Sequence, residues 1–322
     1  MGYYTYFPTN IQSNLIVDKQ RILILGVTAG GKAKLAFELA KKIDAEIISI
    51  DSMKVYRRMD IGTAKPSKEQ QKQLNYHLID VVEPSESFSV DVFLQLMNNA
   101  VEKIEAKGKS IIAVGGSAMY IKAMLFGLFD GPGTNEQIRT QLKEQIAQTS
   151  LGELHKQLTA VDPQAAERIH ANDEKRIIRA LEVYRLTGKP ISNFQQQFDK
   201  PQPNDKWKLL GLAREKTDAS SRINARVKKM FELGLVDEVK NLLAEEKPMS
   251  KQAASAIGYA ETIEHLKGNE TLEKTIEQIK INTRKFAKAQ RTWFKTFKNV
   301  NWLEVQQDDK VENILPRAME LI

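Results

Sequence analysis

Residues 26–33 (GVTAGGKA) have the types and spacing that bind phosphate. They match G-x-x-x-x-G-K, a loop in which backbone N–H groups and the N-terminus of a following helix hold phosphate oxygens and the lysine adds a positive charge. We expect a strand before this loop and a helix after it, over residues 34–42. The alternative is an ordinary strand-to-helix turn. The predicted phosphate-binding residues are Gly26, Val27, Thr28, Ala29, Gly30, Gly31, Lys32 and Ala33.

The last position of this loop departs from the pattern, because Ala33 stands where Ser or Thr is expected. Its methyl group offers no hydroxyl to ligate Mg²⁺, so a metal would need other ligands or would bind more weakly. The chain has no cysteine and only four histidines, which argues against a thiol nucleophile, a zinc centre or an iron–sulfur cluster. Oxygen and phosphate atoms would therefore hold any metal, and its protein ligands are not identified by the sequence.

Three short apolar runs are each followed directly by polar residues. Residues 22–25 (ILIL) precede the glycine loop, residues 46–50 (EIISI) end at Asp51, and residues 110–114 (SIIAV) precede two glycines and a serine. Runs of this length bounded by turn residues are typical of strands buried on both faces. Ligands of open parallel sheets bind beyond the carboxyl ends of the strands. We therefore expect the three polar clusters to meet at one edge of a sheet.

Length, composition and periodicity predict an α/β fold with a helical insertion. The chain has 322 residues, of which 42% are hydrophobic and 28% charged, as in a soluble globular protein of about two domains. We predict a parallel sheet of the P-loop NTPase type with C-terminal helices. The predicted domains are an N-terminal extension (1–20), the core (21–134 and 206–322) and a helical insertion (135–205). In the second half, we expect a strand over 208–213 and helices over 222–243, 272–282 and 284–297.

Positive charge is concentrated in one part of the chain. The net charge is +7, and residues 206–300 hold 20 lysines and arginines against 12 aspartates and glutamates. A basic region of this kind attracts polyanions such as RNA, although a solvated basic helix needs no partner. No apolar run approaches the roughly 18 residues that cross a bilayer, and no secretory signal is recognisable. We therefore expect a cytoplasmic protein with no membrane partner.

Several longer segments resemble the bacterial tRNA dimethylallyltransferase (isopentenyl-diphosphate:tRNA transferase) family. The most restrictive are residues 51–56 (DSMKVY) and 59–66 (MDIGTAKP). The segments occur in the family's order and cover roughly residues 21–297. The other matching segments are 76–80 (YHLID), 115–123 (GGSAMYIKA), 168–183, 257–259 (IGY) and 283–294.

The resemblance implies transfer of a dimethylallyl group from dimethylallyl diphosphate to N6 of an adenine beside the anticodon of tRNA, with release of diphosphate. Asp51 is equivalent to the family's general base, and an exocyclic amine, being a poor nucleophile, benefits from such a base. Lys32, Arg226, the glycine loop and Mg²⁺ would neutralise the departing diphosphate. Ser117 keeps a hydroxyl beside the leaving group. The catalytic residues implied are Asp51, Ser117 and Arg226.

The resemblance also implies a tRNA-binding surface, because the anticodon-loop adenine must be splayed out of its stack to reach the base. Lys54 stands where Gln is common in the family, and Ala260 and Ala289 stand where basic residues are usual. Nothing in the sequence demands an oligomer, so we expect a monomer. The implied tRNA contacts are Asp51, Ser52, Met53, Lys54, Ser117, Arg139, Lys175, Arg176, Ile177, Ile178 and Arg179.

The sequence is compatible with three other functions. A small-molecule kinase would need a hydroxyl at the position of Ala33 to hold Mg·ATP. A prenyltransferase of free adenine nucleotides would share the first-half segments but has no need of the insertion or the basic region. A paralogue that binds RNA with weak or no catalysis would fit the changes at Lys54 and Ala260, whereas the intact Asp51 and Lys32 favour an enzyme.

Overall fold

The computed structural model describes residues 19–128, 131–195 and 206–322. The chain forms two compact units, one comprising Met1–Ile121 with Lys206–Ile322 and the other comprising Lys122–Asp205. The second unit therefore begins earlier in the chain than residue 135, the start that the sequence suggests for the insertion. The predicted N-terminal extension lies almost entirely outside the described residues.

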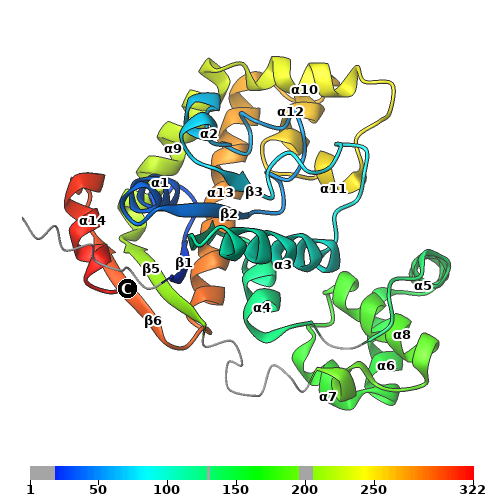
Figure 1. Ribbon diagram of the computed structural model, residues 1–322. Coiled ribbons are helices and arrows are strands. Elements are labelled where there is room, and N and C mark those ends of the chain that lie inside the picture. The colour runs from blue at the N-terminus through cyan, green and yellow to red at the C-terminus, as the bar shows by residue number, and fades with distance from the viewer. Residues whose placement is uncertain (1–18, 129–130, 196–205) are drawn as a thin grey trace, which may run out of the picture. The chain divides into compact units, whose positions relative to one another are not determined.

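The first unit is built on a six-stranded sheet in which every pairing between neighbouring strands is parallel (Figure 1). The order across the sheet is β3-β2-β4-β1-β5-β6. This confirms the predicted α/β class, and β1, β2, β4 and β5 cover the four predicted strands. The strands are β1 (Arg21–Gly26), β2 (Ala45–Ile50), β3 (Tyr76–His77), β4 (Ser110–Gly115), β5 (Trp207–Arg214) and β6 (Val300–Val305).

Both faces of the sheet are covered, which explains why its central strands are continuous apolar runs. Ile22 and Ile24 belong to a core cluster that includes Leu35 and Leu39 of the first helix. The alternate residues Leu23 and Leu25 point to the opposite face, and neither is exposed. The helices that follow β1 to β4 are α1 (Lys32–Lys42), α2 (Lys68–Gln73), α3 (Val90–Ala106) and α4 (Ala118–Phe126).

The basic second half contributes helices whose boundaries differ in part from the prediction. The predicted helix over 222–243 is two helices, which separate at Gly234, where φ is +94°. The two predicted helices over 272–282 and 284–297 are a single continuous helix, α13. These helices are α9 (Lys216–Glu232), α10 (Leu235–Leu243), α11 (Lys251–Ala254), α12 (Tyr259–Leu266), α13 (Leu272–Phe294) and α14 (Val311–Met319).

Helices are the only regular secondary structure in the described residues of the second unit, in agreement with the helical insertion predicted for 135–205. Its core is a cluster of buried leucine, isoleucine, valine and alanine side chains that includes Leu142, Leu158 and Ile177. Within the described ranges, no helix of either unit is both long and apolar enough to span a membrane. The elements are α5 (Glu136–Gln148), α6 (Leu151–Val161), α7 (Pro163–Arg168), α8 (Glu174–Thr187) and a short 3₁₀ helix (Ile191–Phe194).

Candidate active site

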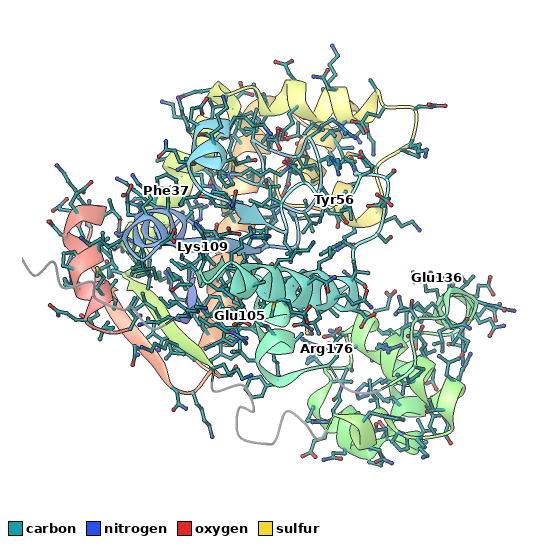
Figure 2. All side chains as sticks on the ribbon, viewed as in Figure 1. Phe37, Tyr56, Glu105, Lys109, Glu136 and Arg176 are labelled. Atoms are coloured by element: carbon teal, nitrogen blue, oxygen red, sulfur yellow. The ribbon has the colours of Figure 1, made fainter. Side chains whose placement is uncertain are left out.

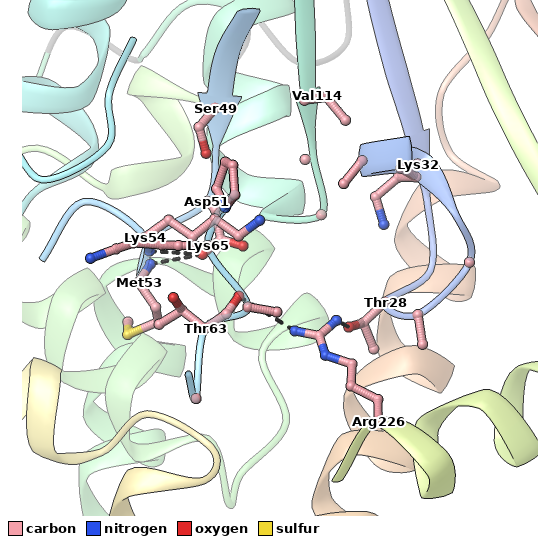
Figure 3. A pocket seen from close by; sticks show the side chains of 18 of the residues that line it. Thr28, Lys32, Ser49, Asp51, Met53, Lys54, Thr63, Lys65, Val114 and Arg226 are labelled. Carbon is pink, nitrogen blue, oxygen red and sulfur yellow. Dashed lines mark hydrogen bonds between the residues drawn. The ribbon is translucent and has the colours of Figure 1, made fainter. Parts of the chain in front are cut away.

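The polar clusters after β1, β2 and β4 meet around one cavity of about 780 Å³ in the first unit (Figure 3). They meet because these strands are neighbours and run in the same direction, so their carboxyl ends lie at one edge. The register pairs Ile50 with Gly115, and a Cβ at Gly115 would lie 1.9 Å from the Ile50 carbonyl oxygen. Glycine is therefore required where these two strand ends approach each other.

The glycine loop adopts a conformation that opens toward this cavity. Gly31, the N-cap of α1, has a φ of +98°, and Ala29 has a φ of +58°. Gly26 and Val27 lie behind the residues that line the cavity, and the phosphate contact expected for both stays a prediction. A Cβ at Gly26 would lie 2.8 Å from the Leu212 carbonyl oxygen, and Val27 is buried. These two residues shape the loop, and the Val27 carbonyl accepts a hydrogen bond from Lys32 Nζ at 2.7 Å.

Two backbone amides of the loop are already used inside the protein. The Gly30 N–H donates to the Val27 carbonyl at 3.1 Å, and the Thr28 N–H donates to Gln290 Oε1 at 2.7 Å. The first N–H groups of a helix, by contrast, have no acceptor within the helix. The amides that begin α1, at Lys32 and Ala33, are therefore the ones placed to hold an anion.

Three arginines hold the loop from the side of β5 and α9. Arg214 Nε donates to the Gly30 carbonyl oxygen at 3.4 Å, Arg222 Nε donates to the Ala29 carbonyl oxygen at 2.9 Å, and Arg226 contacts the Thr28 hydroxyl at 3.3 Å. Arg222 and Arg226 lie one turn apart on α9, so both reach the loop from one helix face. The basic second half of the chain thus brings positive charge to the glycine loop.

Asp51 begins the turn that follows β2 and lies across the pocket from Lys32 in Figure 3. Its Oδ1 accepts hydrogen bonds from the backbone N–H groups of Met53 at 2.9 Å and Lys54 at 3.3 Å. These contacts fix the orientation of the carboxylate and leave Oδ2 outside the turn. Asp51 therefore has a local structural role, but it also presents an oxygen beside the cavity.

Ser117 connects the turn after β2 to the loop after β4. Its hydroxyl accepts a hydrogen bond from the Ser52 N–H at 3.0 Å and donates weakly to the Ser52 hydroxyl at 3.5 Å. Asp51, Ser52, Met53, Lys54 and Ser117 all line the cavity. The predicted residues of these two loops are therefore brought together.

Lys32, Lys54 and Arg226 add three cations to the same cavity. Burial, followed by repulsion from Lys54 and Arg226, lowers the pKa of Lys32 to about 7. Burial also lowers the pKa of Lys54 and of Arg226, and the charge of Asp51 partly opposes both shifts. The cavity therefore favours an anionic ligand, which would offset the cost of holding these charges together.

Residues 62–66 line the cavity, and the segment 59–66 to which they belong is held by contacts that the sequence does not reveal. Glu238 of α10 accepts hydrogen bonds from the backbone N–H groups of residues 60, 61 and 62 at 2.7–3.2 Å and from the Tyr259 hydroxyl at 2.6 Å. A Cβ at Gly62 would lie 2.4 Å from the Tyr259 ring. Lys65 donates to both Asp60 and Asp80. The matching segments at 59–66 and 257–259 therefore pack against each other.

The second unit holds the remaining predicted residues, and two of its arginines are paired internally. Arg139 and Arg179 contact the carboxylate of Glu182 at 2.9 and 2.7 Å, and the Glu182 side chain is fully buried. Burial alone would raise the pKa of Glu182, but hydrogen bonds from Arg139, the Asn135 backbone and Arg179 lower it below its usual value. Both arginines therefore satisfy a buried charge inside their own unit.

The stretch 175–178 divides into exposed and buried side chains. Lys175 is exposed, and so is Arg176, which is labelled in Figure 2 and pairs with Asp173 at 2.7 Å. Ile177 and Ile178 are 0% and 5% exposed and belong to the core of the helical unit. Helical periodicity turns both side chains inward, and the tRNA contact implied for these two residues stays a prediction.

Comparison with known proteins gives consistent matches over nearly the whole chain. Residues 54–297 match the sequence model of the family described as IPP transferase. The chain is 42% identical over 303 residues to a tRNA dimethylallyltransferase of Geobacter metallireducens, covering 94% of this chain and 97% of that protein. It is 43% identical over 290 residues to the tRNA dimethylallyltransferase of Thermotoga neapolitana, covering 90% and 94% of the two chains.

Solved structures show the same similarity. The full-length tRNA isopentenylpyrophosphate transferase of Bacillus halodurans is 37% identical, with a TM-score of 0.69 and coverage of 94% of this chain and 95% of that chain. A eukaryotic dimethylallyltransferase, studied acting on tRNA, is 29% identical, with a TM-score of 0.76. The match covers 94% of this chain and 78% of that chain.

The lowered pKa of Lys32 predicts that anion binding takes up a proton. At pH 8 this amine is mostly neutral in the free protein, and a bound diphosphate would restore its charge. We expect affinity for inorganic diphosphate to rise from pH 9 to pH 7 more steeply in the wild type than in Lys32→Arg, whose side chain stays charged. Calorimetry in two buffers of different ionisation enthalpy would measure the proton uptake. Equal uptake in the two proteins would remove Lys32 from this role.

Proposed function

The chain belongs to the IPP transferase family, and we propose that it transfers a dimethylallyl group from dimethylallyl diphosphate to N6 of an adenine adjacent to the anticodon of tRNA. One observation carries the proposal: a carboxylate and an anion-binding loop face each other across a single cavity. A reaction that removes a proton from one substrate and a diphosphate from the other needs both groups. We further propose that the protein acts as a monomer, since one chain supplies all these groups, and in the cytoplasm, where its tRNA substrate is found.

Asp51 would act as the general base. As the adenine N6 attacks the allylic carbon, a C–N bond forms, the carbon–oxygen bond to diphosphate breaks, and N6 transfers a proton to Oδ2. The two hydrogen bonds from the Met53 and Lys54 amides to Oδ1 keep the carboxylate oriented before substrate arrives. Ser117 supports this arrangement because its hydroxyl holds the Ser52 amide in the same turn.

Departure of the diphosphate would be assisted by the loop amides and by Lys32, Arg226 and Lys54. The allylic carbon becomes cationic as negative charge grows on the leaving group, so fixed donors aimed at the diphosphate stabilise the transition state more than the ground state. Lys54 shares the cavity with the other two cations and repels Lys32 in the free protein. That placement favours a role toward the diphosphate over the tRNA contact expected from the sequence.

The side chains of this cavity do not form a site that would hold Mg²⁺ by itself. Ala33 supplies no hydroxyl, the Thr28 hydroxyl is engaged by Arg226, and the cavity concentrates cations. No group of three or more acidic or histidine side chains in the described residues is arranged to bind a metal. We propose that any Mg²⁺ enters with the diphosphate, and the steps given above need none.

For tRNA binding we propose exposed basic residues of both the helical unit and α13. Lys175 and Arg176 are exposed on α8, and the pair of Arg176 with Asp173 lies at the surface. Arg139 and Arg179 pair with the buried Glu182 and would act by fixing the local surface. On α13, Lys285 and Lys288 are exposed, and Phe286, at 42% exposure, lines the cavity. An aromatic ring between lysines is a surface on which an unstacked base can rest.

Replacing Asp51 with Asn tests the proposed chemistry. The amide oxygen still accepts the two turn hydrogen bonds, but the side chain no longer takes a proton. We expect the transfer rate to fall by about 10²–10⁴-fold with little change in tRNA affinity. The assay incubates the protein with dimethylallyl diphosphate and either tRNA or AMP and identifies the product by mass.

Asp44→Asn, an exposed change at the other end of β2, is the matched control and should be fully active. Modification of AMP but not of tRNA would favour the nucleotide prenyltransferase. Binding of tRNA without any product in the wild type would favour a non-catalytic paralogue.

The proposed RNA surface predicts a steep dependence of tRNA affinity on salt. Removing both exposed charges of α8, in Lys175→Ala with Arg176→Ala, should reduce the slope of log K against log salt concentration by about 1.5. Lys156→Ala removes an exposed charge from α6 of the same unit and serves as the control. A slope that stays at the wild-type value in the double variant would exclude this stretch as a phosphate contact.

A further inference from the structure

Gln290 joins the loops that follow β1 and β4, beyond the last residue pair between these two strands. It lies near the end of α13 and is 3% exposed. Its Oε1 accepts the Thr28 N–H at 2.7 Å, and its Nε2 donates to the Gly116 carbonyl oxygen at 2.9 Å. Thr28 belongs to the loop after β1, whereas Gly116 belongs to the loop after β4. The amide orientation is forced, because one partner is a donor and the other an acceptor.

The Gln290 amide packs directly on the backbone of Gly116, so a side chain at this position would displace it. A Cβ at this position would lie 2.2 Å from Gln290 Nε2. The next residue, Ser117, holds the Ser52 amide, and Ser52 follows Asp51 directly. One side of the Gln290 amide therefore leads to the loop that would bind diphosphate, and the other side leads to the turn that bears the carboxylate.

We propose that Gln290 is a positioning residue that sets the separation between the phosphate loop and the turn bearing Asp51. This inference rests on the proposed function, in which the leaving group and the base must be held at matched positions. Attack at an allylic carbon tolerates little misplacement, since reacting atoms must be close and aligned. Gln290 achieves this from outside the sheet with one side chain whose amide oxygen and nitrogen each make a hydrogen bond.

The substitution that tests this proposal is Gln290→Met, which keeps the length of the side chain and removes both hydrogen bonds. We expect kcat to fall about 10–100-fold and affinity for inorganic diphosphate to fall about tenfold, with tRNA affinity unchanged. Gln278→Met is the matched control, because Gln278 is exposed on the same helix and bonds to Asn282, one turn along that helix. It should match the wild type in all three measurements.

Gln290→Glu tests the role through the pH dependence of kcat, which would not change if Gln290 only filled space in the core. A protonated glutamate accepts from the Thr28 N–H and donates to the Gly116 carbonyl, as glutamine does, whereas a carboxylate faces that carbonyl without a proton. The ratio of its kcat to that of the wild type should therefore rise as the pH falls from 8 to 6. The same ratio for Gln290→Met should stay constant over this range.

Two results would overturn the inference. One is Gln290→Met with kcat and diphosphate affinity equal to those of Gln278→Met, which would make Gln290 an ordinary core residue. The other is a Gln290→Glu variant whose kcat equals that of the wild type at pH 8, where its carboxylate cannot donate to the Gly116 carbonyl; this result overturns the inference even if Gln290→Met fails to fold. If the wild type transfers no prenyl group, the proposed function fails, and the diphosphate measurements still test Gln290.

Discussion

The gathering of positive charge beside the glycine loop is the interaction on which the rest of the site depends. Lys32, Lys54 and Arg226 share one cavity, where burial lowers the pKa of each and mutual repulsion adds to the shift of both lysines. Keeping like charges together in a partly dry cavity costs free energy unless an anion balances them. The lowered pKa values express that cost, and the cavity is therefore organised for an anion before one binds.

The fold holds these charges in place in two stages. The parallel order of β2, β4 and β1 brings three strand ends to one edge, and the close approach of Ile50 and Gly115 fixes their spacing. The helices of the second half then fasten the loops: α9 through its arginines, α10 through Glu238 and α13 through Gln290. The regional basic charge therefore serves the phosphate loop as well as any RNA.

The sequence predicts the parts of this structure that are locally encoded. Buried runs such as residues 22–25 stand out because both faces of the sheet are covered. β3 is too short to give a pattern, and the sequence does not predict β6 because the polar Asn301 and Glu304 interrupt its apolar residues. Pairings between distant residues, such as Gln290 with Thr28 or Arg139 with Glu182, leave no local signal. Resemblance to a family marks such residues without saying what they contact.

Calorimetric titration with inorganic diphosphate in EDTA tests the central claim, that protein cations neutralise the leaving group. The account predicts that the wild type binds diphosphate without metal and that Lys54→Gln binds it about tenfold or more weakly. Lys42→Gln, an equal loss of charge on the exposed end of α1, should bind like the wild type. No binding by the wild type in EDTA, with binding restored when Mg²⁺ is added, would contradict the claim.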